Sequence, residues 1–85
     1  MLVKLHTSKI NDTNKSTIDS IGAYEVFVVN QSANLIFVDG VPIPALTERI
    51  FKAPEGKKWS SNFKLELGNN VSSSVDIYVT KTIDA

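Results

Sequence analysis

Short apolar segments separated by turn signals run along most of the chain and predict β-strands. The clearest is 23–30, "AYEVFVVN", which is aromatic and β-branched and has no helix formers in series. Its apolar side chains fall on both faces of the predicted strand: Tyr24, Val26 and Val28 on one, Phe27 and Val29 on the other. A strand of this kind lies in the centre of a sheet or is covered on one face by another subunit.

Further strands are predicted at 2–6, 35–38, 46–51, 59–67 and 71–83, mostly from alternation of apolar and polar residues. In 46–51, Leu46, Glu48 and Ile50 form the more apolar side, and Glu48 there indicates an exposed strand end. In 59–67, the buried side is predicted to be Trp59, Phe63, Leu65 and Leu67. In 71–83, it is predicted to be Val71, Val75, Ile77 and Val79.

The dipeptide Asp39-Gly40 gives the strongest hairpin signal, because both central residues of a type I′ turn need positive φ. The returning segment, "VPIPAL", carries Pro42 and Pro44, which have no backbone N–H to donate. Because the two prolines are two residues apart, both missing N–H groups lie on the same side of the strand. This favours an edge strand that cannot pair with another strand on that side. A proline-stiffened loop after the turn is the alternative.

The other turn and loop signals in the chain fit a single domain over residues 1–85. Residues 8–20, "SKINDTNKSTIDS", are polar and are expected to form a loop or arm, with a short extended piece near Thr17 to Ile21. Gly22, Gly56 and Gly68 separate other apolar segments. With no amphipathic helix in the pattern, we expect an all-β fold: a small antiparallel β-sandwich or barrel of six to eight short strands.

Composition limits how such a fold is supported. An 85-residue chain without cysteine cannot form disulfides, so oligomerisation is the natural source of extra stability. Nine basic residues balance nine acidic ones, which disfavours a general nucleic-acid binder. No apolar run is long enough to span a membrane, and the interrupted start "MLVKLHTSKI" leads us to expect synthesis in the cytoplasm without a signal peptide. The Asn-x-Ser/Thr matches, including one at Asn30, are interpreted as chance.

The sequence offers no catalytic constellation. His6 is the single histidine, and no Gly-x-Ser-x-Gly or phosphate-binding glycine pattern accompanies it. We therefore predict no catalytic residue, no metal site and no cofactor. His6 is expected to be an exposed strand residue.

Basic and aromatic residues gather in 49–64, "RIFKAPEGKKWSSNFK". The aromatic residues fall in the apolar register and are expected in the core, which disfavours stacking on nucleic acid. Contact of the lysines with an acidic protein surface is at least as well supported. The residues selected as possible partner contacts are Tyr24, Pro42, Pro44, Lys57, Lys58, Trp59 and Tyr78.

The stretch 26–59, with its "VDG" hairpin, "IPA" step and "FKAPEGKKW" lead into a Trp strand, resembles small β-sandwich accessory proteins of tailed-bacteriophage virions. The resemblance implies a capsid decoration protein or a head or tail accessory protein. It would be non-enzymatic, located in the virion, and would act as a homo-oligomer or bound to a capsid or tail protein. The alternative is a carbohydrate-binding or adhesin-like module, with Trp59, Tyr78 and Tyr24 as platforms.

Overall fold

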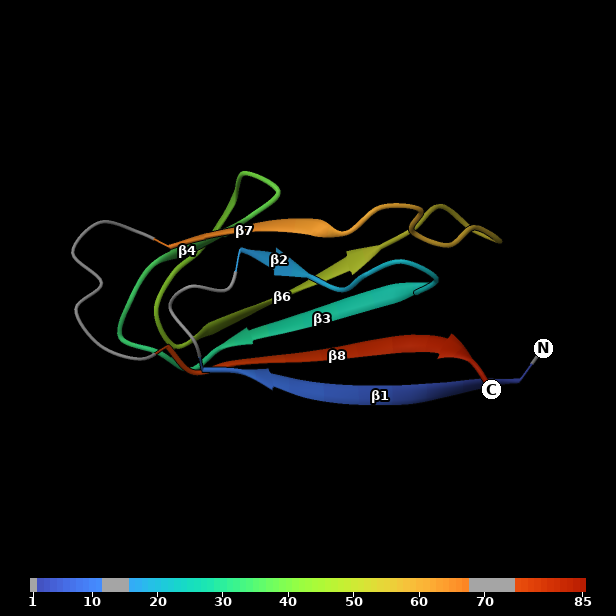
Figure 1. The fold of residues 1–85 in the computed structure, drawn as a ribbon, viewed down its shortest axis with the longest axis horizontal. Helices are drawn as coiled ribbons and strands as arrows, with labels where there is room; N and C mark the ends of the chain where they lie inside the picture. The colour runs from blue at the N-terminus through green and yellow to red at the C-terminus, as the bar shows by residue number, and fades with distance from the viewer. Residues whose placement is uncertain (1, 12–15, 68–74) are drawn as a thin grey trace.

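The computed structural model describes residues 2–11, 16–67 and 75–85, and in these ranges the chain is all β (Figure 1). Its eight described strands are β1 (Val3–Ile10), β2 (Thr17–Ile18), β3 (Glu25–Asn30), β4 (Ile36–Val38), β5 (Val41–Ile43), β6 (Thr47–Lys52), β7 (Phe63–Leu67) and β8 (Ile77–Asp84). They form two four-stranded antiparallel sheets, β1-β8-β3-β6 and β2-β7-β4-β5. The predicted all-β sandwich is confirmed.

The strand order is that of one long hairpin rolled into two layers. β4 pairs with β5, β3 with β6, β2 with β7 and β1 with β8, so every one of these pairs straddles the turn at Asp39-Gly40. The rolled pairs are then joined sideways, β3 to β8 in one sheet and β4 to β7 in the other. This arrangement is an eight-stranded jelly roll.

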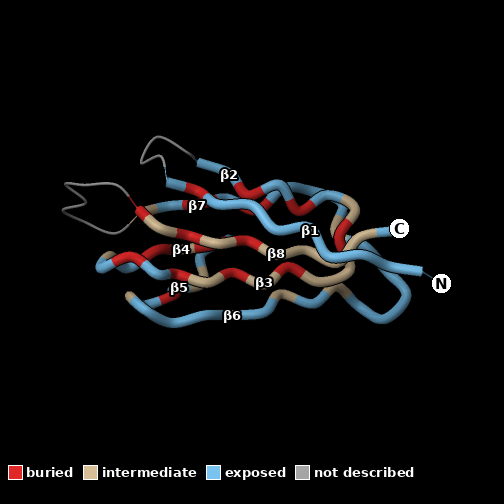
Figure 2. The backbone as a smooth tube through the Cα atoms, turned by 90° about the horizontal axis from the view of Figure 1, so that it is seen from below, coloured by how far each residue is buried: buried red, intermediate tan, exposed pale blue. Residues whose placement is uncertain are grey.

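The core lies between the two sheets, where the buried positions alternate along β3, β4, β7 and the first half of β8 (Figure 2). Its buried apolar residues are Ile10, Ile18, Ala23, Val26, Val28, Ile36, Val38, Ile43, Phe63, Leu65, Val75, Ile77 and Val79. β3 lies between β8 and β6, which confirms its predicted central position. Its inward residues are fully buried, and Phe27 and Val29 on the outward face are half-buried.

The hairpin and its proline-bearing strand agree with the sequence prediction. Asp39 and Gly40 have φ values of 49° and 79°, as a type I′ turn requires. β5 is the edge of its sheet and pairs only with β4 among the described strands, with Pro42 opposite Phe37. The strand interpretation of 41–43 is therefore confirmed, and the alternative of a stiffened loop is wrong for those residues.

Three predictions need correction. The first strand continues to Ile10, three residues into the segment expected to be a loop, because residues 8–10 pair with 77–79 of β8. Trp59 is not part of a strand, since β7 begins only at Phe63. In β6, the side carrying Ile50 faces solvent, and Phe51 on the opposite side packs on the core. The predicted positions Val71 and Gly68 lie outside the described residues.

Candidate functional site

The seven predicted contact residues do not form one surface. Pro42 and Pro44 lie exposed at the β5 edge of the β2-β7-β4-β5 sheet. Lys57 lies exposed in a turn that its backbone N–H closes by donating to the carbonyl of Pro54, at 2.8 Å. Of the remaining four, Tyr24 and Lys58 form a cluster at one end of β8, Tyr78 belongs to a cluster at the other end, and Trp59 packs among core aromatic residues.

Tyr24 and Lys58 meet at Asp84, near the end of β8. The Tyr24 hydroxyl donates to one carboxylate oxygen at 2.7 Å, and the Lys58 ammonium donates to the other at 2.9 Å. Both bonds stabilise the charged carboxylate and so lower the pKa of Asp84, with the Lys58 bond as the larger cause. The same bonds raise the pKa of Lys58 and of the Tyr24 phenol, chiefly through their hydrogen bonds to Asp84. This cluster therefore ties the end of β8 to Tyr24 and to the turn that carries Lys58.

Trp59 is held among core aromatic residues. Its ring meets Phe63 edge to face with centroids 5.0 Å apart, and its indole N–H donates to the carbonyl of Phe51 at 3.3 Å. Its backbone also binds the loop before β3, donating to the carbonyl of Ala23 at 2.9 Å. The residue is half-buried, so its face is not offered as an open platform for a sugar ring.

Tyr78 lies six residues before Asp84 on β8, which places it about 20 Å from the Tyr24 cluster at the usual rise per residue. The Lys9 ammonium lies 5.4 Å from the centroid of the Tyr78 ring and 2.9 Å from a carboxylate oxygen of Asp76. The hydrogen bond to Asp76 is the main reason that the pKa of Lys9 is raised. The three aromatic residues proposed as sugar platforms therefore do not converge.

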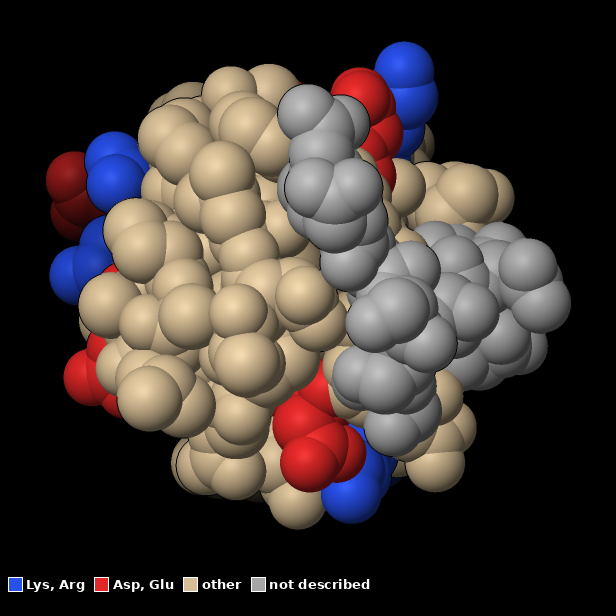
Figure 3. All heavy atoms as spheres, turned by 90° about the vertical axis from the view of Figure 1, so that its left-hand side faces the viewer, with Lys and Arg blue, Asp and Glu red and all other residues tan. Residues whose placement is uncertain are grey.

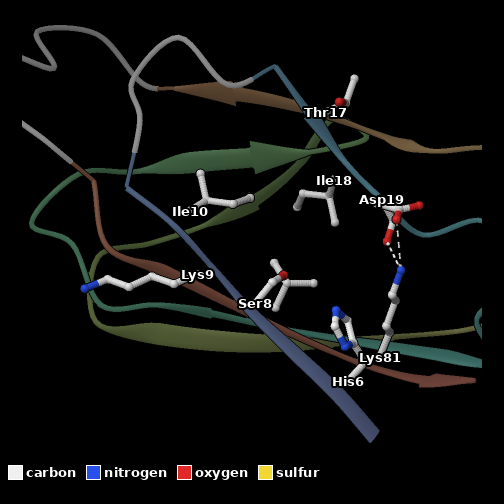
Figure 4. Close-up of a pocket in the computed structure, with 9 residues that line it drawn as sticks. His6, Ser8, Lys9, Ile10, Thr17, Ile18, Asp19 and Lys81 are labelled. Carbon is white, nitrogen blue, oxygen red and sulfur yellow. Dashed lines mark hydrogen bonds and ion pairs between the residues drawn. The ribbon is translucent and has the colours of Figure 1, made fainter.

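A groove of about 230 Å³ opens between the β1 edge of one sheet and the β2 edge of the other (Figure 4). Lys81 crosses it from β8 and binds Asp19, with its ammonium 3.0 Å from the carboxylate. The Lys81 side chain is only 13% exposed, so this ion pair links the two sheets where their apolar contact ends. His6 and Ser8 line the same groove from β1.

The groove does not assemble a nucleophile. Within the described part of the chain, no hydrogen bond joins His6 to Ser8 or to Asp19, and the Asp19 carboxylate is bound by Lys81. Its volume is also below the roughly 300 Å³ at which ligand pockets begin. Across the described ranges, no group of three or more His, Asp or Glu side chains could hold a metal ion. His6 is an exposed strand residue, as predicted.

The strongest candidate for an interaction surface is the face of the β1-β8-β3-β6 sheet that points away from the core. Its centre holds Leu5, Phe27 and Ile50 on three different strands, with threonines from β8 between them, and these side chains line a shallow depression. Leu5 is 71% exposed and Ile50 is 51% exposed. We call this surface, made of Leu5, Phe27, Ile50, Thr80 and Thr82, the outer apolar face.

Charged pairs border the outer apolar face. Glu25 also lines the depression, and one of its carboxylate oxygens lies 3.8 Å from the Lys52 ammonium; the Lys9–Asp76 pair lies further along the sheet. An apolar centre within a charged border is typical of protein–protein contact surfaces. The sequence placed Phe27 and Val29 on one face of their strand without indicating which face points outward, and only the strand order brings Leu5 and Ile50 beside Phe27.

A second weakly charged region lies at the end of the molecule opposite the two termini. Figure 3 shows this end as mostly uncharged, with charged side chains near its margin. The loops 31–35 and 44–46 lie there in Figure 1, and Leu46 is the most exposed apolar residue in them.

Compared with protein-family models, curated proteins and solved structures, the chain matches none significantly. Along the described ranges, no helix is long and apolar enough to cross a membrane. The candidate site is therefore interpreted from its geometry.

Proposed function

We propose that this protein is a non-enzymatic assembly component that binds another protein through its outer apolar face. Its partner would be a capsid or tail protein, and its location the virion, as the resemblance of residues 26–59 implies. One observation carries the proposal: Leu5 and Ile50 are exposed beside the half-buried Phe27, so apolar side chains from three strands meet on one face of the sheet. Contiguous exposed apolar patches of this kind mark interaction sites in soluble proteins.

The topology is compatible with this role without deciding it. Jelly rolls occur in viral capsid domains, and they also occur in lectins and cupins. Fold alone does not assign function, so the fold contributes analogy and the exposed face contributes the physical argument. The carbohydrate-binding alternative receives less support, because Trp59 is half-buried against Phe63 and Tyr78 lies at the opposite end of β8 from the Tyr24 cluster.

Incorporation into particles tests the proposal. Tagged chains would be produced in the cells in which the virions assemble. The virions would then be purified on a density gradient, and the tagged chain in them measured by quantitative mass spectrometry. Ile50→Asp places a charge in the outer apolar face and is expected to reduce incorporation at least tenfold. Ile21→Asp is the matched control, because Ile21 is similarly exposed at 54% but lies outside that face.

Two results would overturn the proposal. The first is a wild-type chain missing from the purified particles. The second is equal incorporation of Ile50→Asp and Ile21→Asp. Far-ultraviolet circular dichroism of both purified variants would confirm that neither substitution unfolds the sandwich, since both side chains are already solvent-exposed.

A further inference from the structure

The two sheets have four edges, and they differ in how readily another strand could be added. β5 is blocked by Pro42, and β2 contributes only two residues. β6 is a six-residue edge, whereas β1 is an eight-residue edge that pairs only with β8 among the described strands. Seven of the eight residues in β1 are exposed, and it contains no proline (Figure 2).

The hydrogen bonds of the sheet fix which backbone groups of β1 point away from β8. The N–H of Ala85 donates to the carbonyl of Leu2 at 3.2 Å, so Leu2 belongs to a hydrogen-bonded pair. Pairs alternate along an antiparallel ladder, so the even-numbered residues of β1 bond to β8. The outward N–H and C=O groups are therefore those of Val3, Leu5, Thr7 and Lys9.

An independent hydrogen bond on the other side of β8 gives the same parity. The N–H of Gln31 donates to the carbonyl of Asp76 at 2.8 Å, so even-numbered residues of β8 face β3. Odd-numbered residues of β8 are left to face β1. The register places odd residues of β8 opposite even residues of β1, for example Val79 opposite Ser8.

We propose that β1 binds the β1 strand of a second copy, antiparallel, with a twofold axis passing at His6. In this register Leu5 lies opposite Thr7 of the second copy, and Val3 lies opposite Lys9 of the second copy. It is the register that pairs all four outward-pointing residues; a shift of two residues in either direction leaves an end residue unpaired. Twofold symmetry makes the contact self-complementary and closed.

The charges on β1 fit this register. Lys9 is placed opposite Val3 of the second copy, and Lys4 is placed opposite Ser8. No lysine faces a lysine, which matters because like charges directly opposite each other destabilise a strand pair. The only other ionisable side chain on β1 is His6, whose register partner on β8 is Lys81.

This inference rests on the proposed function and deepens it. Because odd residues pair with odd residues, both outer apolar faces come to lie on the same side of a continuous eight-stranded sheet, with Leu5 near its middle. With strands about 4.8 Å apart and rising about 3.3 Å per residue, one four-stranded face covers on the order of 450 Å². A standard interface uses about 800 Å² per partner, which the paired faces reach and one face does not.

Site-specific disulfide formation tests the register, and the cysteine-free chain provides a clean background. His6→Cys places two sulfurs at the axis in a non-hydrogen-bonded pair, where Cα atoms are about 4.5 Å apart, within the range for a disulfide. We expect a covalent dimer on mild oxidation. Lys4→Cys alone is the control. In that variant position 4 faces Ser8 of the second copy, and position 4 of the second copy lies about 13 Å away along the strand. A mixture of Lys4→Cys and Ser8→Cys should cross-link as a heterodimer.

Light scattering of Thr7→Pro provides a second measurement. The N–H of Thr7 points away from β8, so proline there removes an edge donor and leaves the β8 ladder intact, as Pro42 does on β5. The wild type should be dimeric and this variant monomeric, with thermal unfolding confirming that the variant is folded.

The inference is wrong if His6→Cys cross-links no faster than Lys4→Cys, or if the wild type is monomeric across the concentration range. If Ile50→Asp still blocks incorporation into particles, the proposed function survives that failure.

Discussion

At the scale of single residues, the buried amide of Asn30 makes five hydrogen bonds to described parts of the chain. Asn30 is fully buried, and its side-chain amide donates to the carbonyls of Asn34, Ile43 and Pro44 at 2.7, 3.0 and 3.2 Å. Its carbonyl oxygen accepts from the backbone N–H and the hydroxyl of Ser32. Asn30 thereby fastens the end of β3, in one sheet, to the end of β5 in the other. Asn30 and Ser32 match the Asn-x-Ser/Thr pattern, but both side chains are buried and bond to each other, so in the described fold they hold this turn together.

Asn30→Asp should therefore destabilise the protein by about 3 kcal/mol or more, because it replaces three donated bonds with a buried carboxylate facing carbonyl oxygens. Asn62→Asp is the control: Asn62 is exposed, and its acceptor oxygen, which receives the Ser20 N–H at 3.2 Å, is retained. Urea unfolding followed by Trp59 fluorescence measures both. Similar midpoints for the two variants would contradict this account of Asn30.

At the scale of elements, the β4–β5 hairpin both turns the chain and contacts a neighbouring strand. The Asp39 side chain accepts from the backbone N–H of Lys64 on β7 at 2.7 Å, and the Asp39 N–H donates to the carbonyl of Lys64 at 2.9 Å. The turn is therefore held in place by β7 as well as by its own dihedral angles.

Gly40→Ala should cost about 1 kcal/mol. A Cβ at Gly40 meets nothing within 4 Å, so the cost comes from the positive φ of 79° alone. Gly40→Asn is the matched variant and should cost less, because asparagine tolerates the left-handed region. Chemical denaturation ranks the three chains. Equal stability of Gly40→Ala and wild type would show that the turn changes conformation to relieve the strain.

Elements set by local chemistry were predictable from the sequence, and those set by distant partners were not. β-Branched and aromatic residues identified β3, alternation identified β7 and β8, and Asp39-Gly40 with Pro42 identified the hairpin and its blocked edge. Trp59 was misplaced because its apolar character continues the alternation of β7, although its backbone bonds to Ala23 instead. The outer apolar face could not be predicted, since Leu5 and Ile50 become neighbours of Phe27 only through pairings over long sequence separations.

At the scale of the whole molecule, the strand pairs of the rolled hairpin differ in the entropy that is lost when each pair forms, because they close loops of different length. Val38 pairs with Val41 across a two-residue turn, whereas Val79 pairs with Ser8 across most of the chain. Closing a long loop costs more entropy than closing a short one, and folds dominated by distant pairings fold in milliseconds to seconds. The hairpin is therefore expected to form early and β1·β8 to form late.

Two matched substitutions test this order, because Val38 and Val79 are both buried in the core. Val38→Ala should slow folding, since the hairpin is already formed in the transition state. Val79→Ala should leave the folding rate nearly unchanged and accelerate unfolding by about the full loss of stability, because its contacts form after that state. Stopped-flow Trp59 fluorescence measures both rates across a denaturant series. If Val79→Ala instead slowed folding as much as Val38→Ala, the closing of β1 against β8 would belong to the nucleus, and the molecule would begin folding from its ends.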